Sequence, residues 1–98
     1  MESNFKILWS DEAIRNLEDI LDYLTSRWTE REISNFKAQL SKQLDFITQF
    51  PYMFPSSEQN ERLRKAVMSK QTIIFYEVKE RVINIAYLFN TRQDPNQL

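Results

Sequence analysis

Four basic residues form the first group in this sequence that could do chemistry. Arg62, Arg64, Lys65 and Lys70 lie within nine positions that hold no acidic residue. Such a cluster can bind phosphate groups or an acidic protein surface. Strand alternation would place Arg64 and Lys70 on one face of a sheet and Lys65 on the other. A strand charged to discourage pairing with other sheet edges is an equally good explanation, so both interpretations stay open.

Arg92 is a second candidate for binding or catalysis. It follows the last apolar run of the chain and is expected at the rim of a sheet. A local contact with Asp94 explains it as well as a functional role does. Tyr76 and Tyr87 stand in apolar strands, which favours packing in the core or at its rim over chemistry.

Three residue types are absent, and their absence excludes several classes of site. The chain has no histidine, no cysteine and no glycine. Without them there is no thiolate nucleophile, no Cys-ligated zinc site and no glycine-rich phosphate loop. The commonest general base and metal ligand is missing too. We therefore predict neither a cofactor nor a metal.

A metal-free ribonuclease would have to take its base from Glu, Asp, Lys or Tyr. A lysine, with a reference pKa of about 10.4, would need strong tuning by its surroundings. The acidic residues between positions 11 and 22 recur on what should be the outer side of a helix, which predicts a solvated face rather than a metal site. They are Asp11, Glu12, Glu18, Asp19 and Asp22.

Length and composition predict one soluble domain spanning residues 1–98. Hydrophobic residues make up 42% of the chain and charged residues 28%, with a net charge of −1. No apolar run is long enough to cross a membrane. The opening MESNFKILWS lacks the pattern of a signal peptide, so we expect a cytoplasmic protein without membrane contacts.

Two helices must position these residues. Ser10 is a predicted N-cap, and Trp9 and Ile14 have the spacing of a hydrophobic staple. A first helix from about Asp11 to Arg27 follows, with an apolar stripe at Ile14, Leu17, Leu21, Leu24 and Trp28. A T-x-x-E capping box at Thr29 and Glu32 begins a second helix, which ends before Pro51. Its stripe comprises Ile33, Phe36, Leu40, Leu44 and Ile47.

The remaining apolar runs predict strands. Residues 5–9 form a short first strand, and residues 63–69, 72–78 and 82–89 form an antiparallel meander. Tyr52, Met53 and Phe54 are expected to tuck under the helices. The order β-α-α-β-β-β predicts an α+β fold, with a helical hairpin on one face of a small, mostly antiparallel sheet and the first strand at or near an edge.

The arrangement resembles the RelE/ParE superfamily of toxins from type II toxin–antitoxin modules. The pattern W-S-x-x-A-x-x-x-L-x-x-I-x-x-Y-L carries the resemblance, together with the strand IIFYEV and the ending LFNTRQDP. In this chain the pattern falls on Trp9, Ser10, Ala13, Leu17, Ile20, Tyr23 and Leu24. The Tyr76 strand and the R-Q-D-P ending are closer to ParE-like sequences.

The resemblance implies a plasmid-stabilisation toxin that is neutralised by a cognate antitoxin. ParE-like members inhibit DNA gyrase by binding, which leaves Arg62, Arg64, Lys65 and Arg92 as target- or antitoxin-binding residues. RelE-like members cut messenger RNA on the ribosome, which would make Arg92, Arg64 and Lys65 catalytic. However, Ile73 stands where RelE-like toxins carry an arginine, and their C-terminal tyrosine falls at or beyond Leu98.

Three functions follow as hypotheses. The chain is a ParE-like toxin that binds a target without chemistry, a RelE-like endoribonuclease, or a diverged inactive module that still holds an antitoxin. In each case the antitoxin is expected along the exposed sheet edge and the basic strand near Arg64.

Overall fold

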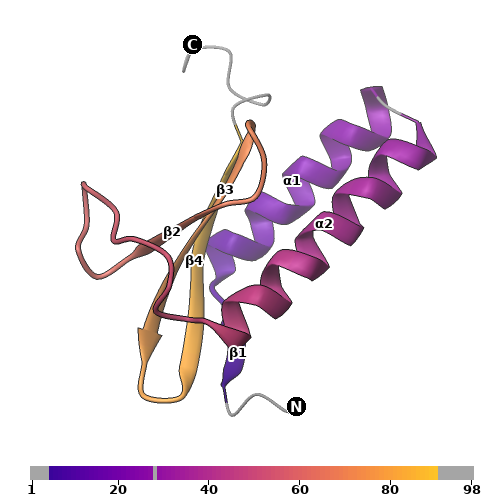
Figure 1. The fold of residues 1–98 in the computed structure, drawn as a ribbon. Coiled ribbons are helices and arrows are strands. Elements are labelled where there is room, and N and C mark those ends of the chain that lie inside the picture. Colours follow the sequence, from indigo (N-terminus) through magenta and orange to yellow (C-terminus); the bar gives the residue numbers. More distant parts are fainter. Residues whose placement is uncertain (1–4, 28, 91–98) are drawn as a thin grey trace.

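The computed structural model describes residues 5–27 and 29–90. Its elements run in the order β-α-α-β-β-β, as predicted (Figure 1). They are β1 (Lys6–Trp9), α1 (Asp11–Arg27), α2 (Glu30–Gln49), β2 (Arg64–Val67), β3 (Thr72–Lys79) and β4 (Val82–Asn90). Trp28 and Arg92 lie outside the described residues, so the predictions made for them stay untested.

The four strands form one sheet in the order β1-β4-β3-β2. The β3–β4 and β2–β3 pairs are antiparallel, and β1 pairs in parallel with β4. The predictions of a mostly antiparallel sheet and of a first strand at its edge are therefore confirmed. The second strand is shorter than predicted and ends at Val67, because the N–H groups of Met68 and Ser69 both donate to the Thr72 carbonyl and form the turn into β3.

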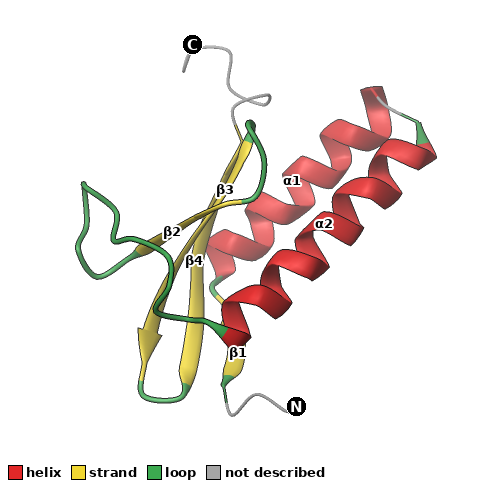
Figure 2. Cartoon of the chain, in the orientation of Figure 1, coloured by secondary structure: helices red, strands yellow, loops and turns green. Residues whose placement is uncertain are grey.

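The two helices lie side by side on one face of the sheet, as predicted (Figure 2). The core fills the space between the layers, with Ile20 from α1, Ile47 from α2 and Ile74, Ile83 and Ile85 from the sheet almost fully buried. Burial of this apolar surface, at about 25 cal/mol per Å2, is the main force that holds the layers together.

The predicted caps form, and they fix where each helix begins. The Ser10 hydroxyl accepts a hydrogen bond from the Ala13 N–H at 2.9 Å. It also donates to the Ala86 carbonyl on β4 at 2.6 Å, so it ties α1 to the sheet. Thr29 accepts from the Glu32 N–H at 3.4 Å and caps α2. The second helix ends at Gln49, two residues before Pro51.

Helix α1 also covers the part of β4 that β1 is too short to reach. The Asn16 side-chain oxygen accepts a hydrogen bond from the Leu88 N–H at 2.9 Å. Together with the Ser10 bond, this contact satisfies backbone groups of β4 beyond the end of β1. The first turns of α1 thus take the place of a strand partner.

Two packing predictions are wrong. Ile14 is 43% exposed, because α1 centres its buried side on Ala13, Ile20 and Leu24. Tyr52 and Met53 are exposed rather than tucked under the helices. The space beneath their turn is filled by the buried Tyr76 side chain, whose hydroxyl reaches the turn's first carbonyl. The predicted stripe of α2 is confirmed, since its members are buried or packed against the core.

Neither helix in the described part of the chain is long and apolar enough to span a membrane.

Candidate functional site

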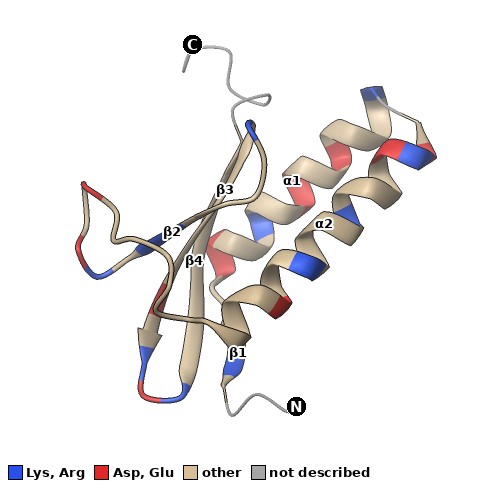
Figure 3. Cartoon of the chain, in the orientation of Figure 1, with Lys and Arg blue, Asp and Glu red and all other residues tan. Residues whose placement is uncertain are grey.

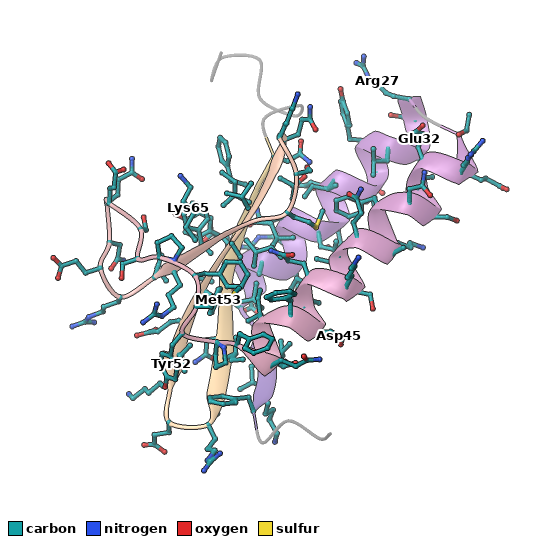
Figure 4. The ribbon with its side chains drawn as sticks, viewed as in Figure 1. Arg27, Glu32, Asp45, Tyr52, Met53 and Lys65 are labelled. Carbon is teal, nitrogen blue, oxygen red and sulfur yellow. The ribbon has the colours of Figure 1, made fainter. Side chains whose placement is uncertain are left out.

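The basic strand divides its two central cations between the faces of the sheet. Arg64 is half-buried on the same side as Ala66, which is fully buried in the core against the helices. Lys65 is exposed on the opposite, uncovered side (Figure 4). Strand alternation predicts this separation, and it means that the two cations do not converge on one point.

The Arg64 guanidinium binds backbone carbonyls of its own chain. Its Nη1 donates to the Tyr52 carbonyl at 3.2 Å and to the Phe54 carbonyl at 2.6 Å. The guanidinium carbon also lies 5.2 Å from the centre of the Tyr52 ring, a cation–π contact. Arg64 therefore fixes the turn that follows α2, a role that its place in a basic cluster does not reveal.

Tyr76 supports the same turn from below. Its side chain is fully buried, and its hydroxyl donates to the Pro51 carbonyl at 2.8 Å. Burial raises the pKa of Tyr76 to about 12, although the nearby Arg64 charge opposes this rise. The phenol is therefore protonated at neutral pH and cannot act as a general base there. The prediction that Tyr76 packs in the core is confirmed.

The face of the sheet away from the helices carries an aromatic pair beside Lys65, with Phe75 buried and Tyr87 partly exposed. The Phe75 and Tyr87 rings stack with centroids 4.6 Å apart, and Lys65 pairs with Phe75 in the β2–β3 ladder. A shallow pocket of about 330 Å3 lies here between residues 55–59, Lys65 and Phe75. Burial, and then the charge of Glu12, raise the pKa of Tyr87, so this phenol too stays protonated at neutral pH.

The other predicted cations stand apart from this pocket. Arg62 and Lys70 are exposed in the segments before and after β2, and neither lines the pocket beside Lys65. Figure 3 shows basic residues dispersed along β2 and at both of its ends. The structure thus brings Lys65 to an aromatic surface but does not assemble Arg62, Arg64 and Lys65 into one site.

The acidic face of α1 is solvated, as predicted. All five acidic residues between positions 11 and 22 are exposed. Within residues 5–27 and 29–90, no three carboxylates gather closely enough to hold a metal ion.

A group of exposed apolar side chains was not identified from the sequence. Phe46, Phe50, Tyr52 and Met53 are 41%, 50%, 60% and 56% exposed. A signal was present, because Phe46 and Phe50 fall outside the apolar stripe of α2. Phe46 in α2 and Phe50, the C-cap residue that follows the helix, stand four positions apart, so their rings lie close together off the buried stripe.

The sequence pattern of one protein family, the ParE toxin of the type II toxin–antitoxin system parDE, matches residues 7–95. This chain belongs to the ParE toxin family. The family match confirms the resemblance found in the sequence and makes this a toxin of the type II class. No curated protein sequence is similar enough to count as a match.

Solved structures share the ParE-family fold at low sequence identity. A chain of the chromosomal ParDE TA system from P. aeruginosa superposes with a TM-score of 0.74 at 14% identity, over 88% of this chain and 95% of that one. YafQ from E. coli strain BL21(DE3) gives a TM-score of 0.60 at 9% identity, over 91% and 96%. A chain of the E. coli DinJ–YafQ toxin–antitoxin complex gives 0.61 at 9% identity, over 93% and 97%.

Proposed function

We propose that this ParE-family toxin acts by binding a protein target, DNA gyrase, and not by cleaving RNA. The observation that carries the proposal is the pair of hydrogen bonds that the Arg64 side chain makes. Its guanidinium holds two carbonyls of its own chain at the turn after α2, on the opposite face of the sheet from Lys65, so the two cations do not converge on one scissile phosphate. The pKa values of Tyr76 and Tyr87 are raised, which removes both phenols as bases at neutral pH.

A second candidate, a RelE-like endoribonuclease, is favoured by one observation. Lys65 lies beside the stacked Phe75 and Tyr87 rings on the face of the sheet away from the helices, where Tyr87 is partly exposed and Phe75 is only 8% exposed. Aromatic platforms next to cations are typical of surfaces that bind single-stranded nucleic acids. In this case Lys65 and Arg92 would be the catalytic candidates. A diverged, inactive toxin that only holds its antitoxin is the third possibility.

The antitoxin partner is supported by the family and by the toxin–antitoxin complex among the similar structures. The outer edge of β2 is a poor site for strand addition, because the chain already covers it. The Lys65 N–H donates to the Pro55 carbonyl at 2.9 Å, and the Ser57 N–H donates to the Leu63 carbonyl at 2.7 Å.

The opposite edge of the sheet is better suited to an added strand. The N–H groups of Lys6 and Ser10 donate toward β4 and the turn before it. Alternation therefore directs the backbone groups of Ile7 and Trp9 away from the sheet, where β1 is the edge strand. We propose that an extended antitoxin segment pairs along β1, with Arg62 and Lys65 left as accessory charged contacts.

Pulse labelling of DNA and protein synthesis, minutes after induction of the toxin in bacteria, tests the proposal. Gyrase inhibition predicts that DNA synthesis falls first. An early fall in protein synthesis would support the endoribonuclease instead. If neither falls while the folded protein accumulates and binds its antitoxin, the chain is the inactive module.

A further inference from the structure

The segment from the end of α2 to the following turn gathers most of the large apolar side chains that the described protein exposes. We define the turn patch as Phe46, Phe50, Tyr52 and Met53, all at least 41% exposed. The remaining ones, Leu8, Ile14 and Val67, are dispersed over β1, α1 and β2. Single exposed apolar residues are ordinary, but four of them between positions 46 and 53 of the chain indicate an interaction surface.

Ring contacts connect the turn patch to the core. The Phe46 ring lies 5.3 Å from Phe50 and 6.0 Å from Phe54, and Phe54 lies 6.3 Å from the buried Tyr76. At the other side of the patch, the Tyr52 ring lies 6.4 Å from Phe5, which precedes β1. Phe46 and Tyr52 thus each contact a ring outside the patch, and Phe50 packs on Phe46.

The backbone beneath the turn patch is held at almost every residue. Tyr76 binds the Pro51 carbonyl, and Arg64 binds the carbonyls of Tyr52 and Phe54. The Met53 N–H donates to the Phe50 carbonyl at 3.1 Å. A surface held in one conformation before it meets its partner loses less entropy on binding.

The composition and shape of the turn patch favour a folded protein as its occupant. Aromatic residues, methionine and arginine are enriched in the central contacts of protein interfaces. A rigid turn with its side chains directed outward fits a recess that already exists in a folded partner. A segment that folds only on binding instead wraps around its partner's surface.

Cations border one side of the turn patch. Within the described residues, Arg64 uses only Nη1 for its two backbone bonds, which leaves its other donors for a carboxylate. Lys6 follows Phe5 in sequence, and its N–H donates to the Arg81 carbonyl, which brings the charged hairpin residues 79–81, two basic and one acidic, to this end (Figure 3). Asp45 adjoins Phe46 on the other side of the patch (Figure 4).

We propose that the turn patch is the surface with which this toxin docks onto its target, inserting into an apolar recess of a folded protein with carboxylates on the rim near Arg64. The inference deepens the proposed function and rests on its claim that the toxin acts by binding a protein. It is independent of whether gyrase is that protein.

The test compares two double variants with the wild type. Phe50→Ser with Met53→Ser alters the turn patch, and Ile14→Ser with Val67→Ser is the control, since these residues are exposed to a similar degree elsewhere. Each purified protein is titrated into a gyrase supercoiling assay, and each is induced in cells to measure growth arrest. Circular dichroism and thermal unfolding establish that both variants fold.

We expect the turn-patch variant to need about tenfold more protein, or more still, for half-inhibition, with growth arrest weakened in parallel. The control should match the wild type. A turn-patch variant that inhibits gyrase and arrests growth like the wild type would overturn the inference and leave the proposed function intact. A control that loses as much activity would overturn it too.

The two proposals can fail separately. If the wild type arrests growth without inhibiting gyrase, gyrase is the wrong target, and the growth assay alone decides on the turn patch. If the wild type does neither, both proposals fall. Should the double variant not fold, Met53→Glu replaces it, because a new carboxylate at this exposed position should repel an acidic rim and weaken both activities by a similar factor.

Discussion

Two turns of this protein differ in what holds their backbone and in which side chains they expose. The hairpin between β3 and β4 and the turn after α2 both reverse the chain without glycine. At the hairpin the residues 79–81 are charged and exposed, and Glu80 takes a φ of 57°. A positive φ at the first central residue is the pattern of a type II′ turn, a position that glycine usually fills.

The turn after α2 has the opposite properties. Its tip is apolar, its backbone has no positive φ, and side chains from β2 and β3 hold its carbonyls. A turn that only reverses the chain needs no buried anchor, as the hairpin demonstrates. The contrast indicates that the anchors at Tyr76 and Arg64 serve the residues displayed at the tip.

Alkaline pH should produce the largest effect on the anchored turn. The pKa of Tyr76 is raised to about 12 in the folded protein, against about 10 in the unfolded chain. The stability that Tyr76 contributes is complete below pH 10 and is lost as the pH rises to about 12, by about 2 to 3 kcal/mol. Urea unfolding at a series of pH values should show this loss in the wild type but not in Tyr76→Phe, and parallel curves would contradict it.

At neutral pH, Tyr76→Phe should lower the free energy of unfolding by about 2 kcal/mol. The substitution keeps the ring but leaves the carbonyl of the buried Pro51 without its partner. Chemical denaturation at pH 7 measures the change. A variant as stable as the wild type would mean that water replaces the hydroxyl and that the turn is not anchored from below.

Arg64→Gln should cost about 1 kcal/mol, because two carbonyls at the partly exposed turn lose a charged donor. The neighbouring Lys65→Gln is the matched control. It removes the same kind of charge one residue away, from an exposed side chain on the other face, and should change stability by less than about 0.5 kcal/mol. Equal effects in urea unfolding would show that charge, and not the turn contact, matters.

Glu80→Gly should have the smallest effect and the opposite sign. Glycine tolerates a positive φ without strain, so the hairpin should gain about 0.5 to 1 kcal/mol despite the extra freedom of the unfolded chain. Arg81→Gly is the control, since its φ is not positive and no gain is expected. The shift in the thermal midpoint of unfolding measures both changes. A Glu80→Gly variant that is no more stable than the wild type would show that the hairpin is not strained at this position.

The elements could be predicted from the sequence because local patterns determine them. The capping residues, the stripe of α2 and the β-branched runs each specify a short segment, and their order led to the superfamily. The hydrogen bonds of the Arg64 side chain could not be predicted. They depend on carbonyls ten to twelve residues earlier in the chain, and no local pattern indicates where that segment will lie.

The candidate surface was missed for a related reason. Tyr52 and Met53 are apolar, and the usual expectation places such residues inside. Tyr76, from a strand more than twenty residues later, occupies the space beneath them and turns them outward. The stack of Phe75 on Tyr87 was equally hidden, since it requires the β3–β4 register and the irregularity between Phe75 and Tyr76.

Titration of the purified wild-type protein into a DNA gyrase supercoiling assay decides whether gyrase is the target. If the toxin acts by binding gyrase, supercoiling should stop at micromolar or lower concentrations of the toxin, and added antitoxin should restore it. A folded protein that arrests growth but leaves supercoiling unchanged at these concentrations would contradict gyrase as the target.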